Sequence, residues 1–170
     1  MARRKRTAVL ISGRGSNMSS LVAAAADPAY PAEIALVLSN RAAAAGLDHA
    51  RANGIATATV SYKAGIAPAE AEMAAAFAAH GIELVCLAGF MRLLSADLVA
   101  AWRDRMINIH PSLLPLFPGL DTHERALASG VKLHGCTVHF VRHEMDSGPI
   151  IGQAAVPVRG WNTTASRRSA

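Results

Sequence analysis

The sequence of 170 residues contains only two cysteines, few aromatic residues and no long apolar run. Cys86 and Cys136 each lie within a short apolar segment and form no Cys-x-x-Cys motif, which excludes a disulfide-rich scaffold and favours reduced, buried thiols. No apolar run approaches the roughly 20 residues of a membrane-spanning helix, and the first apolar segment is too short for a signal peptide. We therefore expect a cytoplasmic protein without a membrane partner.

Several common catalytic and ligand-binding motifs are also missing. The histidines form no His-x-His, His-Glu-x-x-His or Cys/His cluster with the spacing of metal ligands, so we expect no metal site. The absence of Gly-x-Ser-x-Gly disfavours a serine hydrolase. The absence of a Walker lysine argues against a nucleoside triphosphate as ligand.

The net charge of +5 suggests a nucleic-acid-binding protein until the charges are located. Six basic residues occupy the two ends of the chain: Arg3, Arg4, Lys5, Arg6, Arg167 and Arg168. Without these six, the body of the chain carries a net charge of −1. A basic surface for nucleic acid is therefore not expected.

Apolar segments alternate with alanine-rich helical segments. Strands are expected at residues 7–11, 33–38, 55–60, 82–88, 106–109, 135–141 and 149–158, and helices at residues 21–26, 42–53, 69–80, 96–102 and 122–128. This alternation predicts an α/β fold with a doubly wound sheet and right-handed crossovers. Ligands of such sheets lie beyond the carboxyl ends of the strands, so residues 12–17, 89–94 and 108–110 should converge.

Asn108 and His110 are the strongest candidates for chemistry. They are separated by one residue on a predicted strand, so their side chains leave the same face. Pro111 then ends the strand and keeps His110 extended. An amide donor beside an imidazole is suited to a reaction that builds up charge on an oxyanion.

Two other segments have both a structural and a functional interpretation. Residues 12–17 (Ser-Gly-Arg-Gly-Ser-Asn) lie between a strand and a helix, where backbone N–H groups can bind an anion such as phosphate; alternatively, they form a tight turn that simply requires glycine. Asp146 lies in a turn-like sequence and is either an Asx-turn residue or a carboxylate that supports a histidine in proton transfer.

Four segments together carry a resemblance to a known family: residues 11–17 (Ile-Ser-Gly-Arg-Gly-Ser-Asn), 87–94 (Leu-Ala-Gly-Phe-Met-Arg-Leu-Leu), 108–115 (Asn-Ile-His-Pro-Ser-Leu-Leu-Pro) and 146–150 (Asp-Ser-Gly-Pro-Ile). In these segments the chain resembles the phosphoribosylglycinamide formyltransferases, the glycinamide ribonucleotide transformylases of purine synthesis. Asn-x-His with Ser-Leu-Leu-Pro and a later Asp marks the wider group of 10-formyltetrahydrofolate transferases and hydrolases. The turn at 12–17 and residues 119–123 are more specific to the glycinamide ribonucleotide enzymes.

The resemblance implies a Rossmann-like, mostly parallel sheet with an antiparallel C-terminal part. It implies transfer of a formyl group from the cosubstrate 10-formyltetrahydrofolate to the amine of glycinamide ribonucleotide, in de novo purine biosynthesis and without a metal. By position, it implies catalytic roles for Asn108, His110 and Asp146, and substrate phosphate binding by Gly15, Ser16 and Asn17. The folate-binding residues that it implies are Met91, Arg92, Leu93, Leu94, Asn108, Val141, Arg142, His143 and Glu144.

The chain departs from the family at three places. Asp121 stands where the family usually has histidine, and the region near Lys63 lacks an arginine that contacts folate. The resemblance ends after Val158, so we expect a basic N-terminal tail at 1–6, a formyltransferase domain at 7–158, and an atypical tail at 159–170 without the family's C-terminal helix. A truncated, inactive folate-binding fold and a 10-formyltetrahydrofolate hydrolase remain alternatives, and a homodimer stays open.

Overall fold

The computed structural model describes residues 3–159. Its elements follow in chain order: β1 (Lys5–Ile11), α1 (Ser16–Ala25), β2 (Ala32–Ser39), α2 (Ala45–Ala52), β3 (Ala56–Thr59), the 3₁₀-helix η1 (Tyr62–Ala64), α3 (Ile66–Ala79), β4 (Leu84–Leu87), α4 (Ala96–Ala101), β5 (Met106–His110), α5 (Thr122–Ser129), β6 (Leu133–Phe140) and β7 (Ile150–Pro157). Each expected strand and helix is present, with boundaries that shift by one to several residues.

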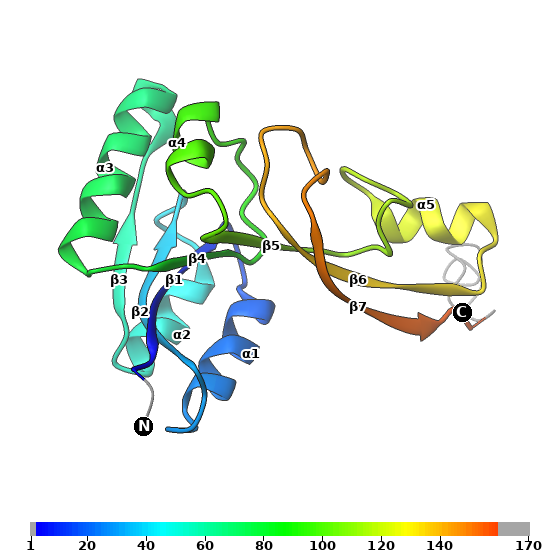
Figure 1. The fold of residues 1–170 in the computed structure, drawn as a ribbon, viewed down its shortest axis with the longest axis horizontal. Coiled ribbons are helices and arrows are strands. Elements are labelled where there is room, and N and C mark those ends of the chain that lie inside the picture. The colour runs from blue at the N-terminus through cyan, green and yellow to red at the C-terminus, as the bar shows by residue number, and fades with distance from the viewer. Residues whose placement is uncertain (1–2, 160–170) are drawn as a thin grey trace.

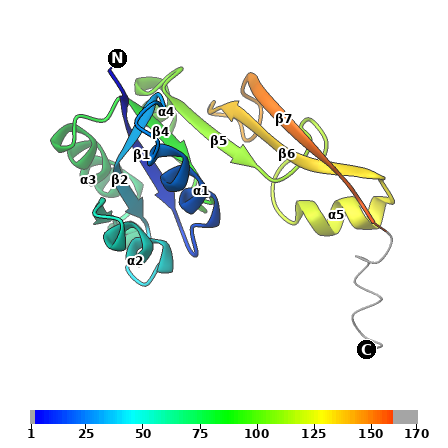
Figure 2. The same ribbon diagram turned by 90° about the horizontal axis from the view of Figure 1, so that it is seen from below.

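The strands form one seven-stranded sheet in the order β3-β2-β1-β4-β5-β6-β7. Strands β1 to β5 are parallel, whereas β6 and β7 join antiparallel, which confirms the expected mostly parallel sheet with an antiparallel C-terminal part. In Figures 1 and 2, helices α1 to α4 surround the parallel strands, while β6, β7 and α5 extend to one side.

Strand β1 explains why helices cover both faces. Leu10 packs into a core with Met73 and Phe77 of α3, whereas its neighbour Ile11 packs into a second core with Met18 of α1. Because successive side chains point to opposite faces, a continuous apolar run is needed where both faces are buried. Helices α3 and α4 therefore lie on one face of the parallel sheet, and α1 and α2 on the other.

Strand β1 begins at Lys5, two residues earlier than the apolar pattern indicates. Arg6 explains the difference, because its guanidinium donates to the carbonyl of His80 and to the carboxylate of Glu33 at 2.7 and 2.6 Å. Two residues of the expected basic tail thus belong to the sheet. The expected atypical tail lies outside the described residues from position 160 onward.

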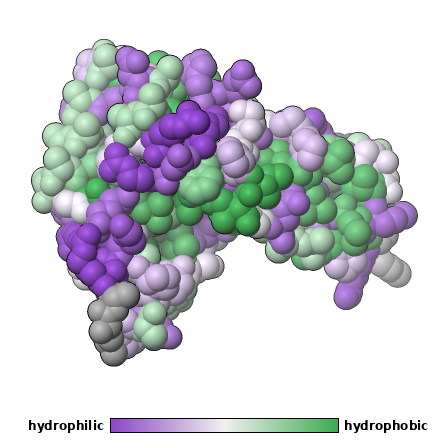
Figure 3. Space-filling model, viewed as in Figure 1, coloured by the Kyte–Doolittle hydropathy of each residue, from purple (hydrophilic) through white to green (hydrophobic). Residues whose placement is uncertain are grey.

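Strands β6 and β7 pair along their length, but β7 is exposed to solvent. All eight residues of β7 are exposed, including the apolar side chains Ile150, Ile151 and Val156. Figure 3 shows apolar surface running from the centre of the molecule across this part. No helix among residues 3–159 is long and apolar enough to cross a membrane.

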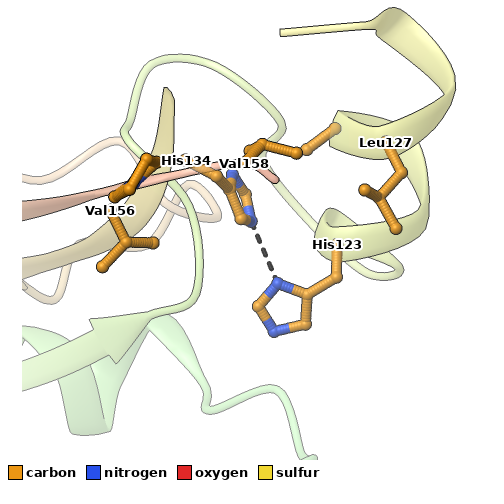
Figure 4. A pocket seen from close by; sticks show the side chains of 7 residues that line it. His123, Leu127, His134, Val156 and Val158 are labelled. Carbon is orange, nitrogen blue, oxygen red and sulfur yellow. Dashed lines mark hydrogen bonds between the residues drawn. The ribbon is translucent and has the colours of Figure 1, made fainter. Parts of the chain in front are cut away.

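A histidine pair joins α5 to β6. Nδ1 of His123 lies 3.0 Å from Nε2 of His134, beside a pocket that Leu127, Val156 and Val158 also line (Figure 4). Burial lowers the pKa of His134, and the nearby His123 lowers it further. The folded chain therefore resists protonation at His134.

The lowered pKa of His134 makes the free energy of unfolding depend on pH. An unfolded His134 takes up a proton below its ordinary pKa of about 6.5, whereas the folded residue does so only at lower pH, so the free energy of unfolding should fall as pH drops from about 6.5. We expect His134→Gln to make this fall shallower in urea unfolding at pH 7 and pH 5.5. His49→Gln, at an exposed site on α2, is the control. Equal slopes in wild type and His134→Gln would contradict the prediction.

Candidate active site

Three loops meet at the carboxyl ends of β1, β2 and β4. The backbone N–H of Ser12 donates to the carbonyl of Gly89 at 3.1 Å, and its hydroxyl accepts the N–H of Met91 at 2.7 Å. The same hydroxyl donates to the side-chain carbonyl of Asn40. The turn at 12–17 and the segment at 89–94 therefore converge, as the strand order predicts.

Gly15 sets the geometry of the turn that precedes α1. It adopts a left-handed conformation (φ 72°) at the N-cap, and a Cβ there would lie 2.9 Å from Met18 Cε and 3.2 Å from Gly46 Cα. Ser16 and Asn17 follow it at the exposed start of the helix. The first turn of α1 has no acidic residue, which leaves the positive end of the helix dipole free for an anion.

Asn108, His110 and Asp146 lie together at the end of β5. Oδ2 of Asp146 is 3.4 Å from Nδ1 of His110, and both side chains are over 90% buried. Asp146 comes from the loop between β6 and β7, where it adopts a left-handed conformation (φ 54°). The chain thus brings Asp146 from the β6–β7 loop to the strand that carries the other two residues.

Asp146 also ties two loops together. Its Oδ2 accepts the backbone N–H of Gly119 at 2.8 Å, so the carboxylate serves another loop instead of capping its own turn as an Asx-turn residue would. A backbone in the left-handed region costs free energy for a residue other than glycine. Such strain at a buried carboxylate is typical of functional sites.

Both ring nitrogens of His110 face acceptors. Nε2 lies 3.0 Å from the carbonyl oxygen of Phe117, while Nδ1 faces the Asp146 carboxylate. A neutral imidazole has one N–H and an imidazolium has two, so only the imidazolium can donate to both acceptors at once. His110 therefore lies between a carboxylate and a carbonyl oxygen, where either ring N–H has an acceptor within reach.

His139 belongs to the same cluster, although no local pattern singled it out as a candidate. It is buried on β6, opposite Asn108 in the register of the β5–β6 pair, and its Nε2 lies 3.2 Å from Nδ2 of Asn108. Oδ1 of Asp146 is 3.8 Å from the same nitrogen. The alternation along β6 placed Thr137 and His139 on one face, but nothing local indicated that β6 pairs with β5.

The residues expected to bind folate flank β5. Met91, Arg92 and Leu93 are exposed after β4, and Leu94 is half-buried. On the other side, the N–H of Val141 donates to the carbonyl of Met106 at 2.9 Å. The residues that follow it run from half-buried to exposed: Arg142, His143 and Glu144. Both segments therefore border the strand that carries Asn108 and leave side chains accessible to a ligand.

The other groups considered for catalysis or ligand binding lie outside this cluster. Within residues 3–159, no group of three or more His, Cys, Asp or Glu side chains is arranged to hold a metal ion. Burial raises the pKa of the Cys86 thiol to about 12, so this cysteine is not a nucleophile near neutral pH. Lys63 is exposed on η1, and Asp121 occupies the N-cap of α5 with φ 54°.

Comparison with known proteins gives a consistent result. A family model described as "Formyl transferase" matches residues 5–168, ten residues beyond Val158. The human trifunctional purine biosynthetic protein adenosine-3 is 47% identical over 166 residues, which is 96% of this chain but only 16% of that protein. The phosphoribosylglycinamide formyltransferase of Escherichia coli (strain K12) is 45% identical over 152 residues, covering 88% of this chain and 72% of the relative.

A solved structure supports the fold assignment. The crystal structure of phosphoribosylglycinamide formyltransferase from Brucella melitensis superposes with a TM-score of 0.90 at 49% identity, covering 98% of this chain and 86% of that chain. Identity and coverage at this level mean that the two chains share one fold.

The turn before α1 offers a direct test. Gly15→Ala should lower the free energy of unfolding by about 1–3 kcal/mol, because alanine is strained at this φ and its Cβ meets Met18 and Gly46. Gly13→Ala is the matched control, since a Cβ there has nothing within 4 Å; it should change stability by less than about 0.5 kcal/mol. Urea unfolding measures both, and equal losses would show that the turn is not held in this conformation.

Proposed function

Because the chain belongs to the formyl transferase family, we propose that it transfers a formyl group from 10-formyltetrahydrofolate to the amine of glycinamide ribonucleotide in de novo purine biosynthesis. The names and similarity of its relatives support this choice of substrates. The observation that carries the chemistry is the buried contact of 3.4 Å between Asp146 and His110, beside Asn108.

The proposed reaction begins when the neutral amine attacks the formyl carbon. A C–N bond forms and the carbonyl oxygen takes up negative charge, which an N–H of Asn108 and an N–H of His110 stabilise. The tetrahedral intermediate then breaks its bond to N10 of the folate. The amine loses one proton and N10 gains one, with Asp146 and His110 as the proton-transfer groups. Nε2 of His110 becomes available when the incoming oxyanion replaces the carbonyl of Phe117 as its acceptor.

His139 completes the proposal as a positioning residue. Its Nδ1 lies 3.0 Å from the carbonyl of Phe140, which holds the proton on that nitrogen. Nε2 is then an acceptor for one N–H of the Asn108 amide, at 3.2 Å. The second N–H of Asn108 remains free to point at the oxyanion.

The substrates have defined places in this proposal. The turn of Gly15, Ser16 and Asn17 holds the phosphate of glycinamide ribonucleotide, and the segments at 91–94 and 141–144 hold the folate. We propose that the domain expected at residues 7–158, extended to Lys5 by the start of β1, is the catalytic domain. We also propose that the reaction uses no metal. We also propose a cytoplasmic location, in keeping with the purine-biosynthetic names of the relatives; the homodimer remains an open proposal.

Turnover with both substrates tests the function. The purified chain is mixed with 10-formyltetrahydrofolate, with and without glycinamide ribonucleotide, and loss of the formyl group is followed by absorbance. Formyl loss that requires the nucleotide supports the proposal. Equal loss without it identifies a hydrolase, and binding of folate without any loss identifies an inactive folate-binding fold.

Asp146→Asn separates chemistry from binding. The amide keeps the shape of the carboxylate and can still accept the N–H of Gly119, but it cannot stabilise a cationic His110. We expect kcat to fall about 100-fold or more, while the dissociation constants of both substrates change less than about threefold.

Asp48→Asn on α2 is the matched control, because this exposed carboxylate pairs only with Arg51 among the described residues. It should keep wild-type turnover. A loss of affinity for either substrate in proportion to the fall in kcat of Asp146→Asn would refute the catalytic role assigned to Asp146.

A further inference from the structure

Tyr62 lies beside the segment that we propose for folate binding. It begins η1, just beyond the carboxyl end of β3, and its ring lies 5.2 Å from the guanidinium carbon of Arg92. The ring of Phe90 packs against it at a centroid distance of 6.4 Å. A guanidinium at this distance over an aromatic ring is attracted by the ring's negative face.

Tyr62 contacts its neighbours through its ring and not through its hydroxyl. The hydroxyl oxygen is buried and has no hydrogen-bond partner among residues 3–159. Glu70 lies nearby, but its two carboxylate oxygens accept the backbone N–H and the hydroxyl of Ser95. A buried hydroxyl without a partner lowers stability, whereas the ring contacts both Arg92 and Phe90.

Arg92 keeps its charge available for a ligand. Within residues 3–159 it pairs with no carboxylate, whereas Arg142 on the other folate segment pairs with Asp104 at 2.6 Å. The backbone next to it is fixed, since the N–H of Met91 donates to Ser12. An arginine on a fixed backbone with its guanidinium held against a ring loses less side-chain entropy when it binds an anion.

We propose that Tyr62 is a positioning residue that holds the Arg92 guanidinium ready for the glutamate carboxylates of 10-formyltetrahydrofolate. The inference rests on the proposed function and adds to it a residue outside the segments at 91–94 and 141–144. Tyr62 acts through Arg92 and touches neither the formyl group nor the nucleotide. Its effect therefore falls on affinity for the acidic end of the cosubstrate.

Two variants separate the ring from the hydroxyl. Tyr62→Leu removes the aromatic face, and Tyr62→Phe keeps it while removing the unpartnered hydroxyl. With saturating glycinamide ribonucleotide, Tyr62→Leu should raise the KM for 10-formyltetrahydrofolate about fivefold and leave kcat within twofold. Tyr62→Phe should match wild type in KM, with a Tm equal to or above that of wild type.

A cosubstrate without the glutamate locates the effect. The KM for 10-formyltetrahydropteroate should be the same in wild type and Tyr62→Leu. In an Arg92→Ala background, Tyr62→Leu should add no further rise in the KM for the folate. An equal rise with both cosubstrates, a rise that persists without Arg92, or no rise at all would overturn the proposal.

Direct binding distinguishes this proposal from the proposed function. Calorimetry with folic acid and pteroic acid on the same variants measures the dependence on the glutamate without turnover. If wild type binds folic acid but transfers no formyl group, the proposed function fails, and the ratio of the two affinities still decides the role of Tyr62. A wild-type chain that transfers the formyl group but binds folic acid no more tightly than pteroic acid supports the proposed function and overturns the role of Tyr62.

Discussion

Double burial of β1 is the constraint on which the rest of the structure depends. Its apolar side chains enter two separate cores, so neither face can be exposed and helices must cover both. Parallel neighbours on each side then align their carboxyl ends at one edge of the sheet. The turn before α1, the segment after β4 and the end of β5 lie close together for this reason, although up to a hundred residues separate them in the chain.

Local patterns in the sequence predicted most of this arrangement. The alternation of strands and helices gave the sheet, and the spacing of Asn108 and His110 placed them on one face of β5. The Ser95 side chain caps α4 by accepting the N–H of Leu98, and Gly130 ends α5 in the left-handed region, both as their residue types indicate. Each of these features depends on residues only a few positions apart.

Contacts between distant segments could not be predicted in this way. His139 reaches Asn108 only through the antiparallel register of β5 and β6, and Tyr62 meets Arg92 only because β3 and β4 end at the same edge. The place of Asp146 near His110 was expected from the family resemblance alone. Periodicity describes which face a residue occupies, but pairing between elements is decided by packing of the whole chain.

The cluster of Asn108, His110, His139 and Asp146 combines hydrogen bonds with close imidazole–carboxylate contacts in a buried setting. Asp146 is the only carboxylate among the described residues that faces His110 in an ion pair, and its backbone holds a conformation that favours glycine. The same Asp146 carboxylate accepts the N–H of Gly119, so one side chain contacts both the end of β5 and the loop that follows it. These contacts join the loop between β6 and β7 to the loop after β5.

Ser12 has a consequence for how two ligands influence each other. Its backbone and hydroxyl bond to Gly89 and Met91, while the glycine turn that follows it leads into α1. A ligand that shifts the turn must also move or strain the segment after β4, because Ser12 is hydrogen-bonded to that segment. The affinities at these two places are then linked, and thermodynamic reciprocity requires that each occupant change the dissociation constant of the other by the same factor. The degree of cooperativity between ligands bound at the turn before α1 and at the segment after β4 would then depend on one serine.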